Sequence, residues 1–133
     1  MNKTRNNVLI GYANDALNNT NGVLFKGNST TDIDSAYNGQ IASLGVSIAM
    51  SGLRPALAIY YQDSSATKVN RRAVLTVIAD MIRRDNFANG QITDAQSLFS
   101  YSLRDNINLN ELKREVEECS IALKQVVRTY NLV

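Results

Sequence analysis

The 133-residue sequence contains no histidine, one cysteine (Cys119) and one proline (Pro55). Without histidine, and with a single thiol, neither the usual zinc sites nor a nucleophile–histidine pair can be built. One cysteine also excludes an intramolecular disulfide. Because Cys119 falls on the apolar face of the last helical segment, we interpret it as a buried thiol. The glycines match neither a dinucleotide-binding nor a P-loop pattern. We therefore expect no catalytic activity and no cofactor.

Charged residues are few, and the two signs nearly cancel. Fourteen Lys and Arg face twelve Asp and Glu, which gives a formal net charge of +2. A nucleic-acid surface therefore requires local segregation of basic residues. The first residues are not followed by an apolar run long enough for a signal peptide. The longest apolar run, 41–61, is interrupted by three serines and Arg54. We expect a cytoplasmic protein without a membrane segment.

Helical periodicity runs through most of the chain and predicts an all-α fold. We expect one compact bundle of five to six helices, in a single domain that spans 1–133. A polar loop at 20–31, rich in Asn, Gly, Ser and Thr, follows the first helix. The residues that we expect to cap later helices are Thr31 or Asp32, Thr93 with Gln96, and Asn108 with Glu111.

The longest apolar run contains one predicted corner, at Gly52. Upstream, residues spaced by four and three predict a helix that buries Ile33, Tyr37, Ile41, Leu44 and Ile48. Gly52 can take the left-handed conformation that closes a helix, and Pro55 suits the first turn of the next one. The run is therefore typical of two helices around a turn, the second spanning Pro55 to about Gln62.

The last helix has the most regular apolar pattern. Steps of three and four connect Leu109, Leu112, Val116, Cys119, Leu123, Val126 and Tyr130. Two interpretations remain open for this seam: it packs into its own domain, or it forms a coiled coil with another chain. We expect outward ion pairs between Lys113 and Glu117 and between Arg114 and Glu118.

Basic residues segregate on the fourth predicted helix, from about Val69 to Arg84. The residues near one meridian are Lys68, Arg72, Thr76 and Arg83, flanked by Arg71 and Arg84. Such a stripe can contact phosphates without reading bases. Asp80 offers an alternative, because it lies one turn before Arg83 and Arg84, where basic residues also favour the helix dipole.

Other candidate residues lie outside this stripe. Lys124 and Arg128, one turn apart on the last helix, form a second possible basic patch. Arg54 adjoins the corner and either contacts RNA or caps helix carbonyls. Tyr60 and Tyr61 either offer rings for base stacking or belong to the core.

Carboxylates remain as possible metal ligands or acid–base pairs. The candidate sets are Asp32 with Asp34, and Glu111 with Glu115 and Glu118. The same spacings occur in helix caps and on solvated helix faces, and we expect those roles and no metal site.

Two segments carry a resemblance to a known family. Ile48, Gly52, Leu53, Leu57, Ala58 and the stretch 59–61 resemble the I-x3-G-L-x3-L-A-F signature of the small-subunit family of type III-B CRISPR effector (Cmr) complexes. The stretch 115–127 is similar to the closing helix of that family, and Lys124 falls on its Lys. The chain departs from the family pattern at several positions. It has Leu44, Gly45, Gln62, Asp63, Ala122 and Gln125 in place of the residues that the family usually has there.

The resemblance implies a non-catalytic small subunit of an RNA-guided, RNA-targeting complex in antiviral defence. The implied partners are the backbone and large subunits, further copies of this chain, and guide and target RNA bound through phosphates. On this basis Lys68, Arg72 and Arg83 are expected to hold the target-strand backbone. An alternative from another class is a helical adaptor or oligomerisation module that uses the heptad seam. A third is a small enzyme that uses carboxylates and a divalent metal.

Overall fold

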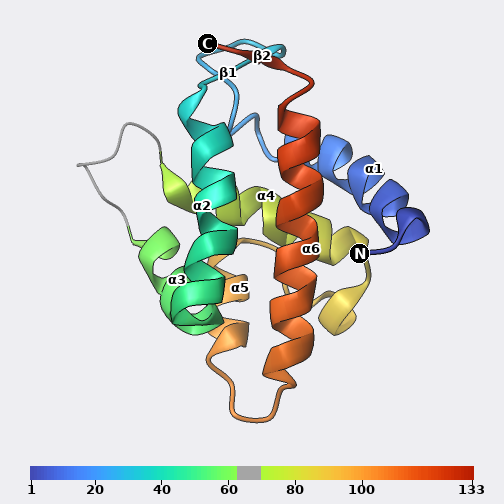
Figure 1. Ribbon diagram of the computed structural model, residues 1–133, viewed down its shortest axis with the longest axis vertical. Helices are drawn as coiled ribbons and strands as arrows, with labels where there is room; N and C mark the ends of the chain where they lie inside the picture. The colour runs from blue at the N-terminus through green and yellow to red at the C-terminus, as the bar shows by residue number, and fades with distance from the viewer. Residues whose placement is uncertain (63–69) are drawn as a thin grey trace.

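The computed structural model describes residues 1–62 and 70–133, and its regular secondary structure is almost all helix (Figure 1). The elements are α1 (Lys3–Asn19), β1 (Asp32–Ile33), α2 (Ala36–Ser51), α3 (Leu53–Tyr61), α4 (Arg71–Arg84), the 3₁₀ helix η1 (Phe87–Gly90), α5 (Ala95–Ser102), α6 (Leu109–Val127) and β2 (Asn131–Leu132). The predicted all-α fold is confirmed.

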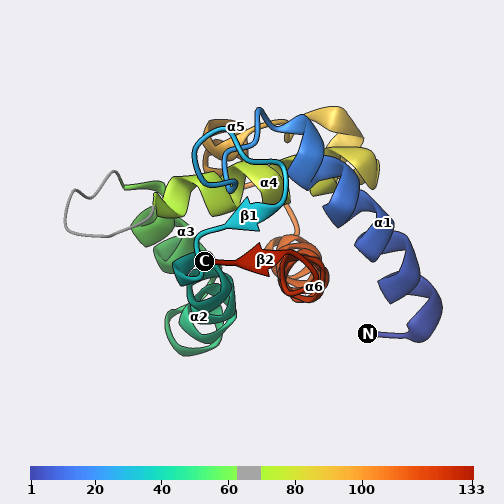
Figure 2. The ribbon, with the colours of Figure 1, turned by 90° about the horizontal axis from the view of Figure 1, so that it is seen from above.

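Helix α4 is the centre of the molecule. It crosses behind α2 and α6, which run side by side in opposite directions (Figures 1 and 2). It contacts each of the other five α-helices, and nine of its fourteen residues are buried. One hydrophobic cluster takes residues from all six helices. A basic stripe along α4 therefore cannot be continuous at the surface.

The predicted corner lies between α2 and α3. The backbone N–H of Gly52 donates to the carbonyl of Ile48 at 2.9 Å and ends α2. Gly52 has φ 90° and ψ 166°, so its φ is positive as expected, but its ψ is extended and the predicted left-handed helical cap is wrong. Because the chain turns within this one residue, α3 begins at Leu53, two residues before the predicted start. Pro55 still lies in the first turn, where its missing N–H costs nothing.

Glycine-to-alanine substitutions at Gly52 and Gly45 are expected to change stability in opposite directions. Gly52 occupies a backbone region that only glycine adopts easily, so Gly52→Ala should cost about 1–3 kcal/mol of unfolding free energy. Gly45 lies inside α2, and a methyl group there meets nothing within 4 Å. Gly45→Ala should therefore stabilise the protein by about 0.5–1 kcal/mol. Urea denaturation of both variants checks the pair, and a stabilising Gly52→Ala would contradict the geometry of this corner.

The start of α2 differs from the prediction. Ile33 is buried as expected, but it belongs to β1, which pairs in parallel with β2 near the C-terminus. The helix begins at Ala36, whose N–H donates to the Asp34 carboxylate at 2.9 Å. The predicted caps Thr31 and Asp32 are therefore wrong. A two-residue strand pairing with residues 99 positions away leaves no periodic signal in the sequence.

The ends of α5 are also shifted. Asp94, not Thr93, caps the helix and forms a capping box with Ser97. Leu103 lies just after the end of the helix and is exposed, whereas Ser102 is buried. The predicted cap of α6 is correct, because the Asn108 side chain accepts from the N–H of Glu111 at 3.2 Å.

The seam of α6 packs into its own fold. Leu112, Val116, Cys119 and Leu123 are fully buried in the isolated chain, and α6 packs on α1, α2 and α4. The interpretation as a coiled coil with another chain is therefore wrong. Among the helices of residues 1–62 and 70–133, none combines the length and apolar character that a bilayer-spanning segment needs.

Candidate nucleic-acid interface

Two arginines at the start of α4 lie on the two tyrosines that end α3. We call Arg71 and Arg72 the arginine pair. The Arg72 guanidinium lies 4.4 Å from the ring centre of Tyr61, and its Nε donates to the Tyr61 carbonyl at 2.8 Å. The Arg71 guanidinium lies 5.5 Å from the ring centre of Tyr60. Contacts of this kind fix the orientation of a guanidinium while its outer edge can still donate hydrogen bonds.

The two tyrosines differ in how deeply they are buried. Tyr60 is a core residue, and its hydroxyl donates to the carbonyl of Gln40 at 2.6 Å. Burial raises the pKa of Tyr60 to about 12. Tyr61 is half-buried, with Arg72 over its ring and Phe99 of α5 stacked on it at 5.2 Å. The core interpretation is therefore confirmed for Tyr60, and Tyr61 acts as the support of Arg72.

The basic residues at the other end of α4 have a carboxylate partner. Both Nε and Nη2 of Arg83 donate to Oδ1 of Asp80, at 3.0 and 2.7 Å. Nε of Arg84 donates to Oδ2 of Asp80 at 2.8 Å. The expected local pairing with Asp80 is confirmed, and Arg83 and Arg84 share its charge.

The structure thus separates the predicted stripe into two groups. Arg71 and Arg72 lie about 18 Å from Arg83 and Arg84 along the helix axis, from the rise of 1.5 Å per residue. Between them, Thr76 is half-buried and donates to the Arg72 carbonyl at 3.2 Å. Lys68 lies outside the described residues.

The remaining candidate residues are spread over other elements. Arg54 donates to the carbonyls of Ser102 and Arg104 at 2.6 and 3.1 Å, so its interpretation as a cap of helix carbonyls is confirmed. Lys124 is half-buried in the last turn of α6, and Arg128 is exposed just after it. Arg54 is therefore the weakest candidate for an RNA contact.

A cluster of ionisable side chains joins α1 to the end of α4 and to α6, and reasoning from the sequence did not find it. Three nitrogens of Arg5 contact carboxylates, with Nη1 to Asp85 at 2.7 Å, Nη2 to Glu115 at 2.9 Å and Nε to Glu118 at 3.3 Å. Glu118 therefore pairs with Arg5 and not with Arg114 as predicted. We call these four residues the Arg5 cluster.

The Arg5 cluster shifts the pKa values of its members. Burial, followed by the neighbouring Asp85 carboxylate, raises the pKa of Glu115 to about 8. Burial alone would raise the pKa of Asp85, but the hydrogen bond from Arg5 lowers it below its usual value. The carboxylates around Arg5 in turn raise the pKa of its guanidinium, so Arg5 stays charged.

The other carboxylates considered as ligands serve local structure. Asp34 accepts from the N–H of Ala36, and Asp32 accepts from the Asn131 side chain at 2.9 Å. Within residues 1–62 and 70–133, no three His, Cys, Asp or Glu side chains are grouped so that they could hold a metal ion.

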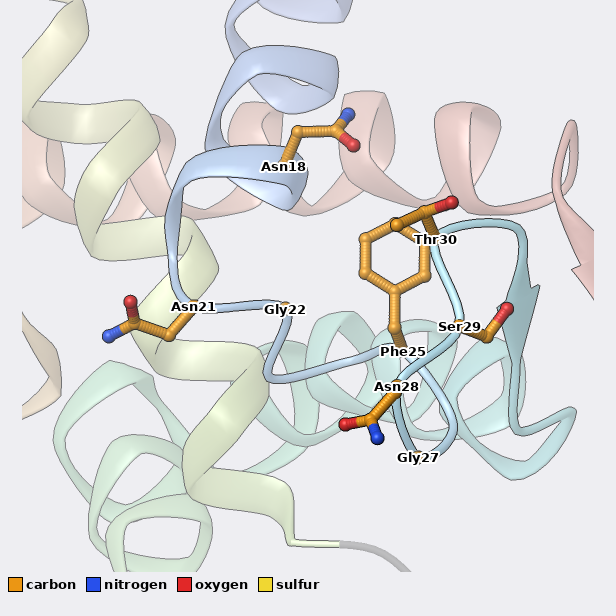
Figure 3. Close-up of a pocket in the computed structure, with 8 residues that line it drawn as sticks. All are labelled: Asn18, Asn21, Gly22, Phe25, Gly27, Asn28, Ser29 and Thr30. Carbon is orange, nitrogen blue, oxygen red and sulfur yellow. The ribbon is translucent and has the colours of Figure 1, made fainter.

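The loop at 20–31 encloses a hollow of about 300 Å³ beside the end of α1 (Figure 3). Its wall includes the ring of Phe25 and the side chains of Asn18 and Thr30, and no charged residue lines it. The amides of Asn21 and Asn28 lie apart and both extend away from the Phe25 ring, so they do not converge on one point (Figure 3). The hollow lacks the convergent polar groups of a specific ligand site.

Comparison with known proteins adds no assignment. No protein-family model, no curated protein and no solved structure matches this chain.

Proposed function

We propose that this chain is the non-catalytic small subunit of a type III-B CRISPR (Cmr) RNA-guided, RNA-targeting complex. In this role it contacts the backbone of the guide–target RNA and helps to assemble the complex in antiviral defence. Catalysis then belongs to other subunits, and the partners are the backbone and large subunits and further copies of this chain. The proposal rests first on the two sequence segments that resemble the family.

The observation that carries the proposal is the arginine pair on the two tyrosines. Tyr60 and Tyr61 end the segment that resembles the family signature, and each lies against one arginine of α4. The signature segment therefore builds the corner and also positions two guanidinium groups. Guanidinium groups held in a fixed orientation suit phosphate contacts, which require no particular base sequence.

A second feature supports contact with protein neighbours. Helix α2 contains no Asp, Glu, Lys or Arg in its sixteen residues, although charged residues make up 20% of the chain. On its outer side, Val46 and Met50 are 58% and 82% exposed. A helix face without charge suits the contact between subunits of an assembly. It equally suits the adaptor alternative, for which the buried α6 seam is no longer available.

The test of the RNA contact is neutralisation of the arginine pair in the assembled complex. Arg71→Gln with Arg72→Gln should weaken target-RNA binding about tenfold at moderate salt and make the slope of log K against log salt shallower by about 1–2. The matched control is Arg83→Gln with Arg84→Gln, which removes the same two charges from the other end of the same helix, where the Asp80 carboxylate already offsets part of that charge. We expect a smaller loss there, measured by filter binding across a salt series.

Two outcomes would overturn this assignment. Unchanged RNA binding by the Arg71/Arg72 variant, in a complex that still assembles, would remove the pair from the interface. An equal or larger loss from the Arg83/Arg84 variant would place the contact at the other end of α4.

A further inference from the structure

The Arg5 cluster contains more negative than positive charge. Three carboxylates surround one guanidinium, so the group would carry a net charge of −2 if all four members were ionised. Glu115 is only 6% exposed, and the side chains of Asp85 and Glu118 are 14% and 20% exposed. Because water screens such a group poorly, a proton on one carboxyl relieves its repulsion.

The start of α1 depends on this cluster for its attachment. Leu9 is the first buried residue of α1, and the buried side chains after it are Ala13, Ala16 and Leu17. Within residues 3–8, Arg5 and Asn6 are half-buried and the other four residues are exposed. The first turns of α1 therefore lack an apolar anchor, and Arg5 provides their ionic attachment to α4 and α6.

We propose that the Arg5 cluster is a proton-controlled latch. With a proton on Glu115, the first turns of α1 dock against α4 and α6; with Glu115 ionised, the three carboxylates repel one another and these turns loosen. The inference concerns the fold itself and holds whatever the chain binds.

The direction of the pH effect follows from linkage. Burial and Asp85 raise the pKa of Glu115 to about 8 in the docked state, whereas an opened cluster returns it to the ordinary range near 4.5. The docked state therefore binds the proton more tightly than the opened state. Docking is most favourable below about pH 4.5 and becomes progressively weaker as pH rises to about 8.

Few other groups titrate near the cluster in this pH range. The chain has no histidine, the usual source of pH dependence near neutrality. The groups that face Glu115 are Arg5, Asp85 and Cys119, and Glu118 accepts a hydrogen bond from Nε of Arg5. The Cys119 thiol lies 3.8 Å from Oε2 of Glu115, and burial raises its pKa well above the usual value, so it stays neutral.

Amide hydrogen exchange of α1 tests the latch. In the wild-type protein, the protection factors of amides in the first turns of α1, corrected for intrinsic exchange, should fall tenfold or more between pH 6 and pH 9, because opening the cluster releases about one proton over this range. Amides of α3, whose main contacts are with α2, α4 and α5, should change much less. In Glu115→Gln, which mimics the protonated carboxyl, α1 protection should be nearly independent of pH.

Glu118→Gln is the matched control, because it removes one charge from the same helix and the same cluster. It leaves Glu115 beside Asp85, so the loss of α1 protection at high pH should remain. The latch is wrong if wild-type α1 protection does not change between pH 6 and pH 9, or if Glu115→Gln loses protection as the wild type does. Carboxyl-carbon NMR of Glu115 gives an independent readout, which must show titration well above the ordinary range of glutamate.

Discussion

Arg5→Met should destabilise the protein by about 3 kcal/mol, because it leaves the poorly solvated Asp85 and Glu118 carboxylates and the Glu115 carboxyl without their guanidinium partner. The methionine keeps much of the aliphatic packing, so the loss reports the missing charge and its hydrogen bonds. Nη1, Nη2 and Nε each contact a different carboxylate, and the three carboxylates come from the end of α4 and from α6. The measurement is the free energy of unfolding in urea at pH 7.

Arg83→Met provides the matched control for this prediction. It removes a guanidinium that also binds a carboxylate, but the Arg83 side chain is 44% exposed and Asp80 keeps Arg84 as a partner. Its cost should be under about 1 kcal/mol. Equal losses in Arg5→Met and Arg83→Met would show that the Arg5 cluster contributes no more than an ordinary surface pair.

Leu57→Ala should cost about 3 kcal/mol, through lost apolar burial and the cavity left behind. Leu57 is fully buried in α3, within the segment that resembles the family signature. Its side chain belongs to the cluster that joins the α2–α3 corner to α4. The loss should appear as a lower midpoint of urea unfolding with an unchanged slope, which indicates a change in stability alone.

Ile59→Ala, two residues further along α3, controls for the change in side-chain size. Ile59 is 41% exposed, so its truncation should cost less than about 1 kcal/mol of unfolding free energy. A cost for Ile59→Ala similar to that for Leu57→Ala would contradict the placement of Leu57 in the core and of Ile59 at the surface.

Local periodicity predicted the helices well where one face decides the pattern. Most of the predicted faces of α2 and α6 are buried, because each helix buries one stripe against its neighbours. The exceptions lie at the ends of the pattern: Leu109 and Tyr130 are only half-buried, and Ile33 is buried but lies in β1. The same reasoning finds only part of the buried surface of α4: Val74, Val77, Ile78, Met81 and Ile82 are buried as their spacing indicates, but Ala73, Leu75 and Ala79 are buried as well. A helix covered on nearly every side has no single apolar stripe. Periodicity therefore does not show that the accessible residues of α4 lie mainly at its two ends.

The Arg5 cluster was missed because its members are far apart in the sequence. Arg5 lies 80 residues from Asp85 and 110 from Glu115. One local signal was present: Glu115 stands three residues after Leu112 and four before Cys119, on the face that α6 buries. A carboxylate at such a position requires a partner, which the sequence alone does not name.

The basic residues illustrate the same limit for function. The sequence placed Arg72 and Arg83 on one meridian and correctly named Asp80 as an alternative partner for Arg83. It did not show that Tyr61 would support Arg72, since that contact depends on the angle between α3 and α4. The structure therefore changes the expected RNA contact from a stripe along α4 to the arginine pair at its start.

Purification from its native cells decides whether this chain is a subunit of an RNA-guided complex. The tagged protein is recovered with and without ribonuclease treatment, and the co-purified proteins and RNA are identified. The proposal predicts CRISPR backbone and large subunits together with short guide RNAs. Recovery of the protein alone, or with unrelated partners and no RNA, would contradict it and leave the signature segment as a helix corner in a protein of another function.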